Sequence, residues 1–92
     1  MRIVLSARAQ QRLRAIRAHI AKDDPGAAER VWWRIGQVIE LPGDFPEMGP
    51  PWDKRSRAVV VSGLPYRIHY RIEAETVRIV TVMHTAQRGP GR

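Results

Sequence analysis

The sequence predicts an α+β fold in which an antiparallel two-helix hairpin packs on a mainly antiparallel four-stranded sheet. Two apolar stripes with helical spacing, separated by a short turn, occupy the first half of the chain, and segments of alternating apolar and polar residues occupy the second. A short alternating segment precedes the first helix, so the expected order is β-α-α-β-β-β. With 92 residues, 43% of them hydrophobic, we expect one domain, residues 1–92, around one modest core.

The first strand and first helix are read from the N-terminal residues. Residues 2–5 alternate, and we expect a strand at a sheet edge or beside a late strand. Ser6 is a favoured N-cap for a helix from Ala7 to about Lys22. The apolar residues of this helix recur at steps of four, three and four and form one stripe: Ala9, Leu13, Ile16 and Ile20.

The second helix is expected to begin at the turn formed by residues 23–26 and to end at residues 41–43. Asp24 can cap it, and Pro25 fits its first position. Trp32 and Trp33 cannot both face the core, because neighbours on a helix diverge by about 100°. Residues 44–56 then form a proline- and glycine-rich loop without regular structure, pinned to the core by Phe45, Met48 and Trp52.

Three strands follow, at residues 57–62, 66–73 and 76–83. Strict alternation in the middle strand assigns Tyr66, Ile68, Tyr70 and Ile72 to the face that contacts the helices. Its opposite face carries a row of cationic and titratable side chains about 7 Å apart: Arg67, His69 and Arg71. The polar tail, residues 84–92, is expected to be flexible.

The face that carries this row is the predicted binding surface. Arg57 starts the neighbouring strand, and the last strand adds Arg78, Val80 and Val82 by the same alternation. Apolar side chains among arginines are more typical of a binding surface than of a solvated sheet face, although the solvated face stays open as an alternative.

Charge and composition restrict the class of partner. The net charge is +7, which favours nucleic acid or an acidic protein as partner. The absence of cysteine in so small a domain favours a reducing, cytoplasmic location, and no apolar run is long enough for a membrane span. No residues have metal-ligand spacing, and no phosphate loop or nucleophile elbow is present, so we expect no cofactor.

His84 closes the last strand and is the best candidate for acid–base chemistry. With Arg67 and Arg88 nearby it would suit cleavage of a phosphodiester, because cations stabilise the developing phosphate charge and a base activates the 2′-hydroxyl. The alternative is a strand-end histidine in a surface hydrogen bond.

Nearly the whole chain resembles the RelE/ParE toxins of bacterial type II toxin–antitoxin systems. The resemblance lies in an ordered set of segments and in no single strict motif: IAKDDPGAAERV at 20–31, the loop around residues 41–49, LPYRIHYRI at 64–72 and VRIVTVMH at 77–84. It implies a helical hairpin on a curved antiparallel sheet, and a cytosolic toxin neutralised by a cognate antitoxin. It also implies that operator DNA is bound only through the antitoxin.

The resemblance leaves two activities open. RelE-like members cleave mRNA on the ribosome without a metal, and Arg67, Arg88 and His84 would be the catalytic counterparts here. ParE-like members inhibit DNA gyrase. Residues 58–61 carry no lysine where RelE-like nucleases often place theirs, and no tyrosine follows His84. We therefore expect a ParE-like toxin, with the nuclease as the alternative and a degenerate member that binds only its antitoxin as a third.

Overall fold

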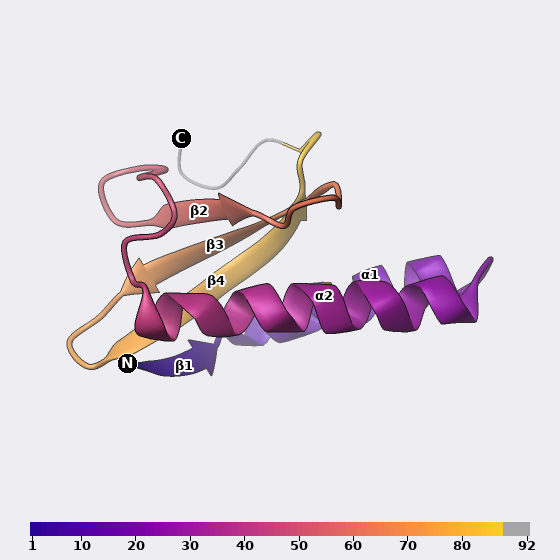
Figure 1. Ribbon diagram of the computed structural model, residues 1–92, viewed down its shortest axis with the longest axis horizontal. Helices are drawn as coiled ribbons and strands as arrows, with labels where there is room; N and C mark the ends of the chain where they lie inside the picture. The colour runs from indigo at the N-terminus through magenta and orange to yellow at the C-terminus, as the bar shows by residue number, and fades with distance from the viewer. Residues whose placement is uncertain (88–92) are drawn as a thin grey trace.

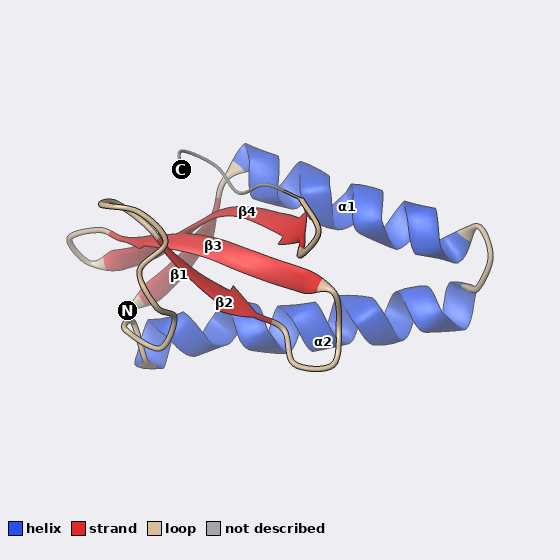
Figure 2. Cartoon of the chain, turned by 90° about the horizontal axis from the view of Figure 1, so that it is seen from above, coloured by secondary structure: helices blue, strands red, loops and turns tan. Residues whose placement is uncertain are grey.

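The computed structural model describes residues 1–87, and its order of elements confirms the predicted β-α-α-β-β-β fold (Figure 1). The elements are β1 (Arg2–Leu5), α1 (Ala7–Ala21), α2 (Pro25–Asp44), β2 (Arg57–Val60), β3 (Tyr66–Ile72) and β4 (Thr76–His84). The two helices run antiparallel along one face of the sheet (Figure 2). Among the described residues, no helix has the length and apolar character needed to cross a membrane.

The four strands form one sheet in the order β1-β4-β3-β2. β1 lies at the edge and runs parallel to β4, whereas the β4–β3 and β3–β2 pairs are antiparallel. β1 therefore meets both expectations, because it lies at a sheet edge and beside a late strand. The last strand of the chain is central in the sheet, where it can contact the helices directly.

Side-chain caps set the starts of both helices as expected. Ser6 accepts a hydrogen bond from the Ala9 amide at 3.0 Å, and its hydroxyl also donates to the Val80 carbonyl in β4 at 2.7 Å. Asp24 accepts from the Ala27 amide at 3.0 Å. One of these caps therefore also fixes α1 to the sheet.

α2 continues to Asp44 and passes through Pro42, slightly beyond the predicted end. A proline this close to the end of a helix removes only one late hydrogen bond, and the Phe45 amide closes the final turn on Leu41 at 2.9 Å. The same turn packs closely on β1, because a Cβ at Gly43 would lie 2.7 Å from the Met1 carbonyl oxygen. Backbone contact with β1 therefore holds the end of α2.

The core lies between the helical hairpin and the sheet. Its fully buried side chains come from α2 and from the middle of the sheet and include Ile35, Ile68, Val77, Ile79 and Val82. Leu13 and Ile16 add the predicted stripe of α1. The apolar alternation of the sequence thus predicted most of this core.

An irregularity between β3 and β4 changes which side chains share a face. His69 is paired with Thr81, but the next residue, Tyr70, is paired with Ile79, so Val80 is an extra residue in β4. The bulge reverses the alternation of β4 beyond this point. Val82 is consequently opposite Ile68 and fully buried, and its prediction as part of the outer face is wrong.

Candidate functional site on the sheet

Arg67 and His69 are buried, although the sequence predicted an open face for them. Their exposed fractions are 8% and 0%. Trp52, from the loop before β2, covers both: its ring lies 4.7 Å from the Arg67 guanidinium carbon and meets the His69 ring edge to face at 4.9 Å. The loop thus adds a third layer over this part of the sheet, and the expectation of an open face is wrong here.

Each of the three guanidinium nitrogens of Arg67 donates a hydrogen bond within the chain. Its Nε donates to Nε2 of His69 at 2.8 Å. Its Nη1 and Nη2 donate to the carbonyl oxygens of Thr85 and Gln87 at 3.3 and 2.6 Å. Arg67 therefore fixes the segment that follows β4 against the outer face of the sheet.

His69 is held in its neutral form. Burial lowers its pKa to about 4, the positive charge of Arg67 lowers it further, and Asp53 partly opposes both effects. Because Nε2 accepts the hydrogen bond from Arg67, the proton of the neutral ring lies on Nδ1. At neutral pH His69 therefore acts as an uncharged acceptor for a buried arginine.

The other predicted members of the binding face differ in exposure. Arg71 is exposed, whereas Arg78 is half-exposed and paired with Glu73 at 3.2 Å. Val80 is half-exposed at the bulge. Arg57 is paired with Tyr70 and therefore belongs to the other face of the sheet, so its expected place on the binding face is wrong; it donates to the Gly49 carbonyl at 2.7 Å. Of this set, Arg71 is the side chain that the fold leaves most accessible.

Two of the three residues expected to form a nuclease site, Arg67 and His84, lie on opposite faces of the sheet. Neighbouring residues of a strand point to opposite faces, and Arg67 is paired with Met83 while Tyr66 is paired with His84. The rings of Tyr66 and His84 meet edge to face at 5.7 Å, on the side of the sheet opposite Arg67. Arg88 and the rest of the expected flexible tail, residues 88–92, lie outside the described residues.

The loop residues were predicted less well than the strands. Trp52 packs onto the fold as expected, but Phe45 and Met48 are 61% and 37% exposed, so the expectation that they pin the loop to the core is wrong. Tyr70 replaces them as the anchor: its hydroxyl donates to the Pro46 carbonyl at 2.7 Å and accepts from the Gly49 amide at 3.0 Å. In the sequence, the signal for this anchor was a tyrosine among the apolar positions of a strand that follows a long proline-rich loop.

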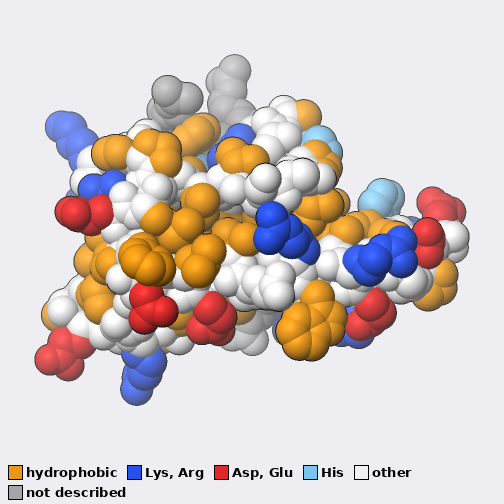
Figure 3. Space-filling view, in the orientation of Figure 1, with side chains coloured by type: hydrophobic (Ala, Val, Ile, Leu, Met, Phe, Trp, Pro, Cys, Tyr) orange, Lys and Arg blue, Asp and Glu red, His pale blue; other side chains and the backbone are white. Residues whose placement is uncertain are grey.

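An apolar surface lies at the end of the sheet, where α2 leads into this loop. A depression of about 630 Å³ is lined there by Met1, Phe45, Met48 and Ile72 together with Pro46 and Glu47. Figure 3 shows hydrophobic side chains gathered over the C-terminal end of α2 and the loop after it. Trp33, on α2, is 68% exposed, as expected for one member of the tryptophan pair.

Comparisons with known proteins agree on one family. The family model for the ParE toxin of the type II toxin–antitoxin system parDE matches residues 3–89. A protein of Sinorhizobium fredii named "Putative toxin Y4kP" is 44% identical over 90 residues, which are 97% of this chain and 93% of that protein. A solved structure titled "Chromosomal ParDE TA system from P. aeruginosa" has a TM-score of 0.83 at 17% identity, over 91% of this chain and 95% of the other, and so shares the fold. The chain therefore belongs to the ParE toxin family of type II toxin–antitoxin systems.

Proposed function

We propose that this protein inhibits growth by binding DNA gyrase and that a cognate antitoxin neutralises it. The observation that carries the proposal is the match to the ParE toxin family over residues 3–89. The arrangement of the sheet residues supports binding as the mode of action, because Arg67 and His84 lie on opposite faces of the sheet and Arg67 already donates hydrogen bonds within the chain.

The nuclease alternative is not favoured by the environment of Arg67. A catalytic arginine must present donors to the phosphate as negative charge develops on it. All three guanidinium nitrogens of Arg67 already donate to His69, Thr85 and Gln87. His84, the candidate acid or base, lies across the sheet from it.

The accessible part of the predicted binding face supports an acidic, amphipathic antitoxin segment as the neutralising partner. Arg71 is exposed and Val80 half-exposed on this face, which offers a cation beside an apolar surface. The net charge of +7 favours association with an acidic chain. Operator DNA would then be contacted by the antitoxin and not by this domain.

A supercoiling assay tests the proposed target. Purified toxin is added to gyrase, ATP and relaxed plasmid, and toxin mixed beforehand with its antitoxin serves as the control. We expect supercoiling to stop with free toxin and to continue with the mixture. Normal supercoiling at saturating toxin would refute the gyrase proposal.

Two further measurements separate the remaining possibilities. Primer extension on translated mRNA should show no toxin-dependent cuts, whereas cuts in the ribosomal A site would establish the nuclease alternative.

Arg71→Glu should weaken antitoxin binding about tenfold or more, because it replaces an attraction by a repulsion at an exposed site. Unchanged affinity of the folded variant would place the antitoxin elsewhere on the domain.

A further inference from the structure

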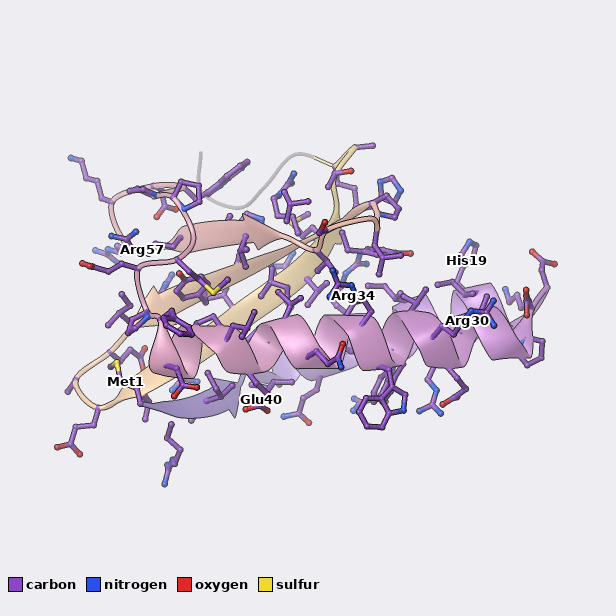
Figure 4. The ribbon with its side chains drawn as sticks, in the orientation of Figure 1. Met1, His19, Arg30, Arg34, Glu40 and Arg57 are labelled. Atoms are coloured by element: carbon purple, nitrogen blue, oxygen red, sulfur yellow. The ribbon has the colours of Figure 1, made fainter. Side chains whose placement is uncertain are left out.

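A second group of polar side chains lies on the helix-covered side of the sheet, away from Arg67 and His69. It lines a depression of about 370 Å³ between α1 and the ends of β3 and β4. Arg12 and His19 come from α1, Tyr66 begins β3, His84 ends β4, and Gln87 follows it. Figure 4 shows His19 projecting from α1 on the side toward the sheet.

The fold explains why these residues meet. Arg12, Ile16 and His19 follow each other at steps of four and three, so they lie on one face of α1. Tyr66 and His84 are directly paired across β3 and β4. Packing of α1 against β4 brings the two sets together around one opening.

Two hydrogen bonds hold Arg12 at the rim of the depression. Its Nε donates to the Val82 carbonyl and its Nη2 to Oε1 of Gln87, both at 3.2 Å. No residue among 1–87 accepts a hydrogen bond from its Nη1. A guanidinium that is fixed in place but keeps free donors is preorganised for an anionic ligand.

His84 also presents a donor. Its Nδ1 accepts from the Ala86 amide at 3.1 Å, so the proton of the neutral ring lies on Nε2. Within residues 1–87, nothing accepts from the Tyr66 hydroxyl. The depression therefore combines the guanidinium of Arg12 with two further donors, Nε2 of His84 and the Tyr66 hydroxyl.

Within residues 1–87, no acidic side chain lines the depression. The two ion pairs found within residues 1–87 join Arg17 to Glu29 and Arg78 to Glu73, and neither residue pair lines this depression. Donors without a counter-charge favour an anion, and a metal ion would instead need acidic or additional imidazole ligands. Ile16 and the Tyr66 ring add an apolar wall beside these donors.

We propose that this depression binds a phosphate monoester. Arg12 and His84 donate to the phosphate oxygens, and the organic part lies against Tyr66 and Ile16. The proposal goes beyond the proposed growth inhibition and does not rest on gyrase or antitoxin binding.

NMR titration of the ¹⁵N-labelled full chain tests the proposal. Inorganic phosphate, adenosine 5′-monophosphate and adenosine are added separately, with chloride keeping the ionic strength constant. We expect saturable shifts around Arg12, Tyr66 and His84 with both phosphates, tighter binding of the nucleotide, and no such shifts with adenosine. Nucleotide binding no tighter than that of inorganic phosphate would overturn the monoester assignment.

Matched variants separate this site from general attraction to a basic protein. Arg12→Gln and His84→Gln should each weaken nucleotide binding about tenfold, the usual effect of losing a hydrogen bond to a charged group. Arg71→Gln also removes one positive charge, but from the opposite face of the sheet. It should therefore leave the affinity for the nucleotide unchanged. His84→Gln keeps the test valid if Arg12→Gln disturbs the fold, since Arg12 also bonds the backbone. Equal loss in Arg71→Gln, or shifts spread over all basic residues, would refute the site.

Discussion

The burial of neutral His69 predicts that the domain loses stability at mildly acidic pH. Its folded-state pKa is about 4, below the ordinary value of 6.5, because burial and the neighbouring Arg67 disfavour a second positive charge. His69→Gln removes this titration while Oε1 of glutamine still offers an acceptor to Nε of Arg67. The variant therefore separates the ionisation of residue 69 from its hydrogen bond.

The sign of the effect follows from the two pKa values. Between pH 6.5 and 4 the unfolded chain binds the extra proton and the folded chain does not, so the free energy of unfolding falls as the pH falls. From pH 7.5 to 4.5, His69 lowers the free energy of unfolding by about 2.5 kcal/mol at most. Water entry and structural relaxation at the buried ring reduce this effect, so we expect a decrease between about 1 and 2.5 kcal/mol. Asp53, whose pKa is lowered from 3.8 chiefly by the Arg55 amide, loses its contribution only below this window.

Urea denaturation followed by tryptophan fluorescence measures this difference. The free energy of unfolding is determined at several pH values between 4.5 and 7.5 for the wild type and for His69→Gln. We expect the free energy of unfolding to decrease more steeply with falling pH in the wild type than in His69→Gln. Equal slopes for the wild type and His69→Gln would refute the claim that burial holds His69 neutral.

Three substitutions test the packing of the fold by the free energy of unfolding. Gly43→Ala should destabilise by about 1–3 kcal/mol, because its Cβ would lie 2.7 Å from the Met1 carbonyl oxygen; no loss would contradict this close approach. Gly36→Ala should stabilise by about 0.5–1 kcal/mol, since residue 36 lies in the interior of α2 and its added Cβ meets nothing within 4 Å. A lower stability of this variant would contradict the open space at residue 36. Tyr70→Phe should cost about 1–3 kcal/mol by leaving the Gly49 amide without its acceptor, and a neutral effect would show that the loop does not depend on this hydroxyl.

The elements of the fold were predictable because their signals are local. Ser6 and Asp24 cap the helices they were expected to cap, and the apolar stripe of α1 faces the core. Arg34 shows what local patterns miss: it reaches from α2 toward the sheet and donates to the Ser62 carbonyl at 3.2 Å (Figure 4). No periodicity in either segment indicates this contact, because it depends on how the turn after β2 is placed over the helix.

The outer face was predicted less well because two non-local features determine it. Alternation assumes an uninterrupted strand, and the extra residue Val80 breaks that assumption in β4, so Val82 turns inward. Sequence alternation also says which face a residue points to, but not what covers that face. Trp52 covers Arg67 and His69 from a loop whose path no periodic pattern describes.

The burial of Arg67 bears directly on the choice between cleavage and binding. Nη1 and Nη2 of Arg67 already donate to the carbonyl oxygens of Thr85 and Gln87, and a phosphate that took the place of these acceptors would have to displace both. Each hydrogen bond to a charged group contributes about 1.5–3 kcal/mol, so the displacement would offset much of what a new phosphate contact provides. Trp52 would also have to move from the guanidinium. In this chain Arg67 therefore holds the segment after β4 against the sheet, and its hydrogen bonds favour a structural role over a catalytic one.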